Sequence, residues 1–252
     1  QCIKKYKNHN IDGIIYVSQS PSSPLPTRAC LIQDALKISK NSFAFDVNQG
    51  CSGFIYALSL ANSLIETKEA ERILIVCSDY YTKYISVKDR TSRPIFSDAA
   101  AAVLIESSNS SKIGPFIFKT DGSGAKHLAV NKGKDGKQEL YMNGPAVLKF
   151  SLDLVPKATD ELLKKASMRK EDIDLFIFHQ ASAVVLDKLQ KKLEIPNKKW
   201  TKLIENFGNT VSATIPIALN ILEKNKKIKN NKYYLLMGFG VGLSVGGCII
   251  ST

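Results

Sequence analysis

The sequence has 252 residues, of which 44% are hydrophobic and 23% charged, and its formal net charge is +12. This composition is typical of a globular protein, and the length allows one large domain or two packed halves with an ample core. No uninterrupted apolar run reaches the roughly 18–20 residues that a membrane helix needs, and no basic-then-apolar leader is present, so we expect neither a membrane-spanning segment nor a secreted protein.

The cysteines and the lysines limit the possible location and partners. The five cysteines, at positions 2, 30, 51, 77 and 248, form no CxxC pair and no metal-ligand spacing with the three histidines. We therefore expect a cytoplasmic, reducing location and no metal. The positive charge is compatible with nucleic acid, with an acidic protein or with compositional bias alone. Because no nucleic-acid-binding signature accompanies it, we expect no nucleic-acid partner.

In chain order, the first half of the sequence predicts alternating strands and helices. The chain begins at Gln1, and its first seven residues look like the end of a helix, so we expect it to be part of a longer protein. A strand follows in IDGIIYVSQS (11–20). The predicted elements after it are an apolar run at 43–45, a helix in GCSGFIYALSLANSLIE, a strand from Ile73 and a small-residue strand, AAAAVLIES.

The second half repeats this order at a nearly constant offset. Its matching segments are IDLFIFHQAS (173–182), GNTVSATIPIALNILEK, a strand from Tyr233 and GLSVGGCII. Each half therefore reads strand, helix, strand, helix, strand, strand. The strands are too continuously apolar for a sheet with one solvent face, which predicts helices on both faces of each sheet.

The repeat predicts an α/β protein with a layered α/β/α/β/α fold made of two duplicated lobes. We place the first lobe at 1–108 and the second at 109–252, with the junction in the Ser-rich segment 107–114. The Gly- and Lys-rich segment 120–141 is predicted to be a surface loop with a short hairpin. If the lobes are related by a pseudo-twofold axis, their equivalent turn-to-helix corners meet at the centre.

Cys51 lies at one of these corners, in DVNQGCSG (46–53). A buried cysteine most often packs as a small hydrophobic residue. The alternative is a nucleophile, because the free N–H groups and partial positive charge of a helix start favour a thiolate. A pKa lowered to about 7 would leave such a thiol half ionised at neutral pH. The sequence around Cys51 leaves both possibilities open.

His179 and Asn209 are further candidates, and neither is specific alone. His179 follows the apolar run LFIF, where a half-buried structural histidine is the common case. Asn209 takes the place in the second half that Cys51 has in the first, and it is also a good turn residue or helix N-cap. The glycine-rich stretch 238–242 precedes no helix pattern, which argues against a dinucleotide loop. Its backbone N–H groups are suited instead to an oxyanion.

Four segments together closely resemble 3-oxoacyl-(acyl-carrier-protein) synthase III, a condensing-enzyme family of the thiolase superfamily: DVNQGCSGFIYAL, FHQAS, ENFGNTVSATIPIAL and GFGVGLSVGG. The resemblance runs in order through the whole chain and implies the family's two duplicated thiolase-like lobes. The family has a further segment before the equivalent of Gln1. The resemblance also implies a homodimer that uses an acyl-CoA and a malonyl-acyl-carrier protein as substrates, with no cofactor.

The resemblance assigns a catalytic role to each candidate. Cys51 matches the nucleophile that accepts an acyl group from a thioester. His179 and Asn209 match the pair that binds the malonyl thioester carbonyl and stabilises the enolate as carbon dioxide leaves. The backbone N–H groups of Cys51 and Val241 match the oxyanion hole of the acyl-transfer step. The implied reaction is a decarboxylating Claisen condensation through an acyl-cysteine.

The resemblance also implies residues that bind the substrates. Arg90 matches a CoA-binding arginine, and Leu25 and Phe239 match residues of the acyl pocket, with Leu25 reaching it across a dimer interface. The residues matching the carrier-protein dock are Lys149, Lys191 and Lys192. Carrier proteins are acidic, so a basic rim would steer their association. These lysines also fit a plain solvated face, and the sequence does not decide between the two.

Several alternatives remain at this stage. Val184 and Ser182 differ from the family pattern, which hints at a specialised relative. One alternative is an acyltransferase of the same fold that moves an acyl group to an amine or alcohol in a lipid, glycan or secondary-metabolite pathway. A 3-hydroxy-3-methylglutaryl-CoA-synthase-like reaction would need a glutamate base, and none stands in a matching motif. From another class, the chain could be an inactive lobe that only dimerises or docks a carrier protein.

Overall fold

The computed structural model describes residues 10–133 and 136–252. The start of the predicted first lobe, residues 1–9 with the expected helix end, lies outside the described residues. So do residues 134–135 of the predicted hairpin segment.

Two four-stranded mixed sheets form the framework. In the first sheet the order is β2-β1-β3-β4, and in the second it is β5-β10-β9-β8. In the first sheet β1 lies parallel to both β2 and β3, and β4 is antiparallel to β3. In the second sheet β8 and β9 are parallel, and β10 is antiparallel to β9 and β5. The strands are β1 (Gly13–Val17), β2 (Phe43–Val47), β3 (Arg72–Asp79), β4 (Ala99–Glu106), β5 (Lys112–Thr120), β8 (Leu175–Phe178), β9 (Tyr233–Gly240) and β10 (Ser244–Ser251).

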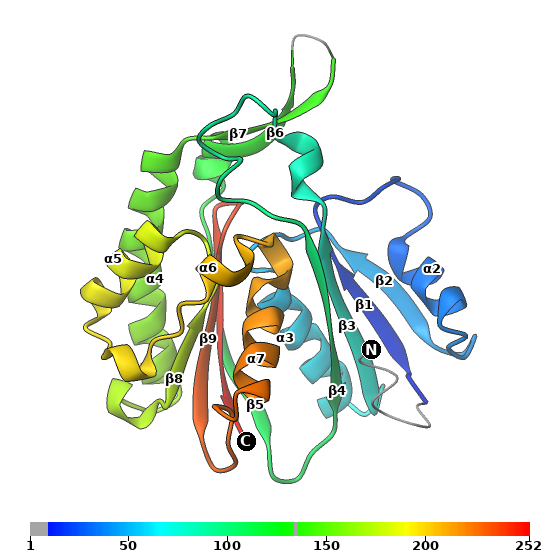
Figure 1. Cartoon of the computed structure of the whole chain (residues 1–252). Helices are drawn as coiled ribbons and strands as arrows, with labels where there is room; N and C mark the ends of the chain where they lie inside the picture. Colours follow the sequence, from blue (N-terminus) through cyan, green and yellow to red (C-terminus); the bar gives the residue numbers. More distant parts are fainter. Residues whose placement is uncertain (1–9, 134–135) are drawn as a thin grey trace.

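Helices cover both faces of each sheet. Figure 1 shows α2 outside the first sheet, α3 and α7 between the sheets, and α4 and α5 outside the second sheet. The predicted α/β/α/β/α layering is therefore confirmed. The helices are α2 (Arg28–Ala35), α3 (Gly53–Glu66), α4 (Gly144–Lys165), α5 (Ala183–Leu193), α6 (Ile204–Phe207) and α7 (Thr214–Lys224). Short 3-10 turns are η1 (Tyr81–Tyr84), η2 (Gly122–His127), η3 (Lys170–Asp172), η4 (Asn197–Lys199) and η5 (Val211–Ala213). No helix in the described ranges is both long and apolar enough to cross a membrane.

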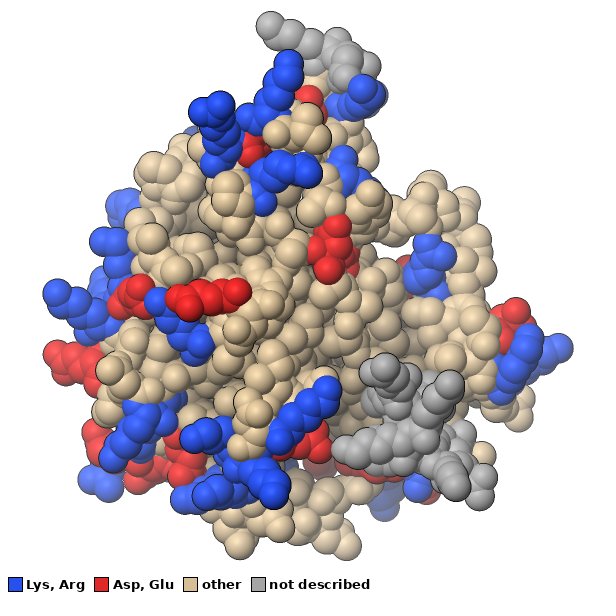
Figure 2. All heavy atoms as spheres, viewed as in Figure 1, with Lys and Arg blue, Asp and Glu red and all other residues tan. Residues whose placement is uncertain are grey.

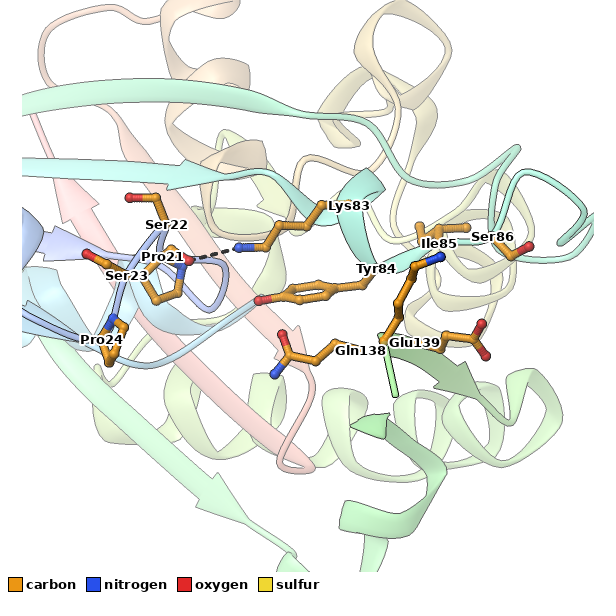
Figure 3. Close-up of a pocket in the computed structure, with 11 residues that line it drawn as sticks. Pro21, Ser22, Ser23, Pro24, Lys83, Tyr84, Ile85, Ser86, Gln138 and Glu139 are labelled. Carbon is orange, nitrogen blue, oxygen red and sulfur yellow. Dashed lines mark hydrogen bonds between the residues drawn. The ribbon is translucent and has the colours of Figure 1, made fainter. Parts of the chain in front are cut away.

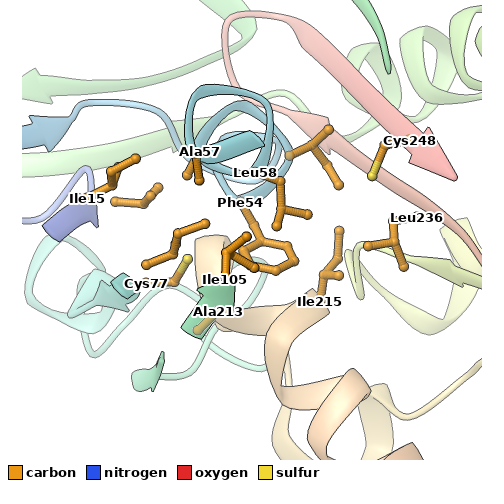
Figure 4. Close-up of a cluster of buried hydrophobic side chains, with 14 of the residues drawn as sticks. Ile15, Phe54, Ala57, Leu58, Cys77, Ile105, Ala213, Ile215, Leu236 and Cys248 are labelled. Atoms are coloured by element: carbon orange, nitrogen blue, oxygen red, sulfur yellow. The ribbon is translucent and has the colours of Figure 1, made fainter. Parts of the chain in front are cut away.

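The central layer follows from the sequence of α3, which is apolar nearly all round. A helix of this kind has to be buried on most of its surface. Phe54 and Leu58 of α3 are 1% exposed and belong to one core cluster with side chains from both sheets and from α7, among them Ile15, Ile215 and Leu236 (Figure 4). This helix therefore ties the two halves together.

Three strands keep the same order in both halves, and the halves differ at the edges of the sheets. β5 lies beside β10, whereas no described strand lies beside β4 in the first sheet. The strands β1, β3 and β4 correspond to β8, β9 and β10. The strand expected to match β2 is reduced to an isolated bridge between Phe176 and Trp200. That prediction was wrong because Pro196 and the η4 turn, Asn197–Lys199, precede Trp200, and Pro, Asn and Lys are disfavoured in strands.

The connections agree with the sequence. Residues 107–111 join the last strand of the first sheet to β5, which pairs in the second sheet. The predicted hairpin is confirmed as β6 (Leu128–Lys132) paired antiparallel with β7 (Gln138–Met142). Figure 1 shows this hairpin projecting beyond the ends of the two sheets. Its base lies over the region where the catalytic candidates are found.

Candidate active site

One small, largely buried cavity brings the three catalytic candidates together. Its volume is about 110 Å³, and Cys51, His179 and Asn209 all line it. The predicted meeting of the two corners at the centre is therefore confirmed. The other lining residues are Ile95, Phe96, Leu128, Met142, Gly144, Val147, Leu148, Ser151, Ala181, Ser182, Val185, Phe239 and Gly240. Most are apolar, so the cavity offers few polar groups besides the three candidates.

Cys51 is held by a tight turn and by a strand that passes very close to it. The N–H of Gly53 donates to the carbonyl of Gly50 at 2.7 Å, and α3 begins directly afterwards. On β9, a Cβ atom at Gly240 would lie 2.8 Å from the Cys51 sulfur, and one at Gly238 would lie 2.8 Å from its carbonyl oxygen. Gly240 also has a φ of +155°. Glycine is thus required at both strand positions for this approach.

The thiol of Cys51 is protonated at neutral pH. Burial raises its pKa from 9.0 to about 12, and hydrogen bonds from the backbone N–H groups of Val241 and Cys51 only partly oppose this. The expectation of a lowered pKa was wrong, because the side chain is 6% exposed and desolvation dominates. The same two N–H groups are those predicted for the oxyanion hole, and the fold directs both at the sulfur.

His179 extends the pairing of β8 with β9 and is completely enclosed. Its backbone N–H donates to the carbonyl of Met237 at 2.8 Å, and its ring lies edge-on to Phe239, with the ring centres 5.6 Å apart. The ring atom Nδ1 is 2.7 Å from Oγ1 of Thr214. Burial lowers the pKa of His179 to about 3, so the imidazole is neutral at physiological pH.

Asn209 is anchored by its backbone and oriented by its side chain. Its backbone N–H donates to the carbonyl of Ile95 in the other half of the molecule, at 2.9 Å. Its Nδ2 donates to the carbonyl of Ala181 at 3.1 Å, and its Oδ1 accepts from the N–H of Val211 at 2.9 Å. These bonds fix the amide and leave Nδ2 a second hydrogen to donate. Asn209 is not a helix N-cap, because α7 begins only at Thr214.

Of the two residues predicted to form an acyl pocket, one lines the cavity. Phe239 is 1% exposed and forms part of the wall beside His179. Leu25 is 81% exposed in the loop between β1 and α2 and is not among the lining residues. Arg90, the predicted CoA contact, is likewise exposed, in the loop between η1 and β4, and lies outside the cavity wall.

The lysines predicted to dock a carrier protein lie on the outer layer of the second half. Lys149 near the start of α4 forms an ion pair with Asp153, and Lys191 and Lys192 end α5. The pKa of Asp153 is lowered chiefly by its hydrogen bond from Lys149 and further by the charge of Lys192. Figure 2 shows basic and acidic side chains mixed over α4 and α5.

Several residues of the site had not been predicted. Tyr81 and Phe96 stack with ring centres 5.4 Å apart, and both belong to one buried cluster with Cys51. Leu128 and Met142, opposite each other at the base of the hairpin, close another side of the cavity. Thr214 was missed as the partner of His179. The sequence shows which residue type stands at each of these positions. Only long-range packing brings these residues close to the Cys51 thiol.

A larger hollow elsewhere contains none of the catalytic candidates. It has a volume of about 830 Å³ and lies between the segments 21–24, 83–86 and 137–139 (Figure 3). Lys83 crosses it and donates to the carbonyl of Pro21 at 2.8 Å. The smaller cavity is the better candidate because it holds a thiol, an imidazole and an oriented amide. Within the described ranges, no group of three or more His, Cys, Asp or Glu side chains is placed to hold a metal ion.

Known proteins resemble this chain in sequence and fold. Residues 45–122 match the family model of 3-oxoacyl-[acyl-carrier-protein (ACP)] synthase III, and residues 163–252 match the model of its C-terminal part. A β-ketoacyl-[acyl-carrier-protein] synthase III of Clostridium perfringens is 36% identical over 96% of this chain and 78% of its own length. A crystal structure of a 3-oxoacyl-(acyl-carrier-protein) synthase III is 39% identical, with a TM-score of 0.91 over 96% of this chain and 79% of that one. The corresponding structure from Aquifex aeolicus is 32% identical, with a TM-score of 0.90 over 96% and 77%.

Proposed function

The chain belongs to the 3-oxoacyl-(acyl-carrier-protein) synthase III family, and from this membership we infer that it condenses an acyl-CoA primer with malonyl-acyl-carrier protein. The product is a 3-oxoacyl-acyl-carrier protein, and the enzyme is an acyltransferase. The observation that carries the proposal is the convergence of Cys51, His179 and Asn209 on one small, largely buried cavity.

In the first step, Cys51 takes the acyl group. Its sulfur attacks the thioester carbonyl of the acyl-CoA, the new carbon–sulfur bond replaces the bond to CoA, and the thiol proton leaves with the CoA sulfur. The N–H groups of Cys51 and Val241 receive the developing oxyanion. Removing one such donor typically costs about 100- to 1000-fold in rate. Because the pKa of Cys51 is raised to about 12, the attack has to be coupled to loss of the proton.

In the second step, His179 and Asn209 bind the malonyl thioester carbonyl. As the carboxylate leaves as carbon dioxide, its bonding electrons form an enolate whose oxygen accepts hydrogen bonds from the imidazole and the Asn209 amide. The enolate carbon attacks the acyl-cysteine, and the released Cys51 thiolate takes up a proton. An apolar cavity favours this step, because a carboxylate is destabilised there and carbon dioxide is not.

Thr214 sets which ring nitrogen of His179 carries the hydrogen. A neutral imidazole donates to the enolate only through Nε2–H, which requires Nδ1 to act as an acceptor. The hydroxyl of Thr214 is 2.7 Å from Nδ1 and 3.2 Å from the carbonyl of Val211, its other acceptor. Donation to Nδ1 is the shorter contact, and it leaves Nε2–H free to bind substrate.

The remaining site assignments and partners are part of the same proposal. We propose that Arg90 contacts CoA, that Lys149, Lys191 and Lys192 dock the acidic carrier protein, and that no cofactor is needed because both steps are completed by groups of the chain and its substrates. A homodimer is supported by exposed apolar side chains in this part of the sequence: Leu25, Leu31 in α2 and Leu36 directly after α2 are 81%, 42% and 45% exposed. A cytoplasmic, reducing location suits a nucleophilic thiol.

Acyl transfer to an amine or alcohol is not favoured as an alternative. Relatives that are 34% and 36% identical over 95% and 96% of the chain are β-ketoacyl-acyl-carrier-protein synthases III. Transfer alone has no use for a pair of enolate-binding groups, whereas His179 and Asn209 are both buried at the thiol, at 1% and 4% exposure.

Intact-mass spectrometry tests the proposal. The protein is incubated with acyl-CoAs of increasing chain length, beside Cys51→Ala and the matched control Cys248→Ala, which removes a buried thiol that does not line the cavity. We expect a mass increase equal to one acyl group in wild type and control and none in Cys51→Ala. Malonyl-acyl-carrier protein should then discharge the adduct as a 3-oxo product. An adduct that persists in Cys51→Ala, or one that malonyl-carrier protein leaves in place, contradicts the proposal.

A further inference from the structure

A buried carboxylate beside the site has no part in the two chemical steps. Asp79 ends β3 and is 3% exposed. Among the described residues, its partners are hydroxyl and backbone N–H groups, and no lysine or arginine forms an ion pair with it. A buried anion without a cation is costly unless it is fully hydrogen-bonded, so this arrangement calls for a reason.

The two oxygens of Asp79 face different halves of the molecule. Oδ1 accepts from the hydroxyls of Ser18 and Ser20, at 3.2 and 2.8 Å, and from the N–H of Gln19 at 2.9 Å. All three donors lie directly after β1 in the first half. Oδ2 accepts from the hydroxyl and the N–H of Ser212, at 2.5 and 3.3 Å, in the second half. One carboxylate therefore joins the strand ends of the first sheet to the loop before α7.

That loop carries both groups that prepare the second substrate step. Ser212 is the middle residue of η5, between Asn209 and Thr214. Its neighbour Val211 has a φ of +55°, in the left-handed region that β-branched residues avoid. The N–H of Val211 donates to Oδ1 of Asn209, and its carbonyl lies 3.2 Å from the hydroxyl of Thr214. A strained residue of this kind persists only where its surroundings impose the conformation.

We propose that Asp79 is a positioning residue: by holding Ser212 from the opposite half, it imposes the conformation of 209–214 that directs the Asn209 amide at the substrate and Thr214 at His179. The inference rests on the proposed function. It makes the condensation half-reaction depend on a residue of the first sheet that touches neither substrate nor the reacting atoms. Only a carboxylate meets the requirement, since both oxygens face donors and an amide would turn its NH₂ against one set.

The test compares Asp79→Asn with Asp46→Asn. Asp46, on β2 of the same sheet, is half-buried and also accepts two backbone N–H groups, from Arg28 and Ala29 at 2.7 and 2.9 Å, away from the cavity. Acylation of Cys51 is followed by intact mass, and condensation by release of carbon dioxide from malonyl-acyl-carrier protein. Thermal unfolding reports on stability.

For Asp79→Asn we expect acylation to proceed at least as fast as in wild type, because the charge of Asp79 contributes to the raised pKa of Cys51. The kcat of condensation should fall about ten- to hundredfold, the range for a lost hydrogen bond to a charged group, with the KM for malonyl-carrier protein unchanged. Ser212→Ala, which removes the shorter bond to Oδ2, should give the same split if Asp79→Asn fails to fold. Asp46→Asn should leave both steps unchanged. Equal losses of acylation and condensation, or wild-type condensation in Asp79→Asn and Ser212→Ala, would overturn the inference.

A second readout does not depend on turnover. The chain has three histidines, so nitrogen NMR of ¹⁵N-histidine protein resolves the ring of His179. We expect Asp79→Asn and Ser212→Ala to shift its Nδ1 and Nε2 signals, and Asp46→Asn to leave them in place. If the His179 ring signals are unshifted in both Asp79→Asn and Ser212→Ala, the inference is overturned. If wild type forms no acyl adduct but the two variants show these shifts, the proposed function is refuted and the positioning role of Asp79 stands.

Discussion

The turn before α3 and the loop before α7 take equivalent places in the two halves, yet they are built differently. The first is compact: the helix begins directly after the Gly50–Ser52 turn, and Cys51 is pressed against two glycines of β9. The second is irregular: a 3-10 turn with Val211 at positive φ separates Asn209 from the helix.

This difference matches two kinds of chemistry. In the proposed mechanism, the reacting group at the first corner is a side-chain sulfur, and the stabilising groups are the backbone N–H donors of Cys51 and Val241. At the second corner a side-chain amide is the donor, and backbone groups serve to orient it. A duplicated fold thus supplies two equivalent corners, and their local backbone decides that one suits acyl transfer and the other suits enolate binding.

Replacing Asn209 should separate the two corners most clearly. Asn209→Ala removes an amide donor to the enolate, and we expect condensation to fall about 100- to 1000-fold, as for an oxyanion-hole donor. Acylation of Cys51 should persist at the wild-type level. The two rates are measured by carbon dioxide release and by intact mass. Loss of acylation to the same extent would mean that the corners do not act separately.

Crowding the first corner should slow the acylation of Cys51, the step that Asn209→Ala leaves unchanged. A Cβ at Gly240 would lie 2.8 Å from the Cys51 sulfur, so Gly240→Ala should displace the thiol and slow acylation about 100-fold, the typical cost of a misplacement of about 1 Å. Gly122→Ala, where a Cβ meets nothing within 4 Å, is the matched control. If Gly240→Ala is acylated as fast as Gly122→Ala, the close approach of β9 does not position the sulfur.

Thr214 tests how the second corner prepares His179. Thr214→Val removes the hydroxyl at Nδ1 while keeping the shape, and we expect condensation to fall about tenfold, the effect of one hydrogen bond. Thr214→Ser should restore most of the rate, since it restores the donor. The rate of carbon dioxide release provides the measurement. A serine variant as slow as the valine variant would rule out control of the ring hydrogen by the hydroxyl.

The neutral ring of His179 predicts the smallest effect, on stability. Its folded pKa of about 3 lies below the ordinary 6.5, so its contribution is complete above pH 6.5 and is lost as the pH falls toward 3. Wild type should lose about 2 kcal/mol more than His179→Gln between pH 6.5 and 5, measured by urea unfolding. His127→Gln, at a partly exposed histidine, should follow wild type. If His179→Gln and wild type lose the same free energy of unfolding over this pH range, the proton taken up on unfolding does not bind His179.

Much of the architecture was predictable because it rests on local pattern. Continuous apolar strands, the largely apolar α3 and the internal repeat predict two helix-covered sheets and the convergence of Cys51, His179 and Asn209. The pattern failed at Trp200, where a proline and a lysine-rich turn leave only a bridge. It also failed for the pKa of Cys51, because burial from all sides outweighs the helix start.

The sequence by itself therefore predicted the layered fold and the repeat from periodicity, and its resemblance to the family named Cys51, His179 and Asn209 as the candidate reacting side chains. Only the tertiary structure decided the protonation of Cys51, the orientation of Asn209, the contact of Thr214 with His179 and the bridge from Asp79 to Ser212. Each of these depends on groups from distant segments brought within hydrogen-bond distance, or on water being excluded by the opposite half. A local sequence pattern predicts neither the long-range hydrogen bonds nor the exclusion of water.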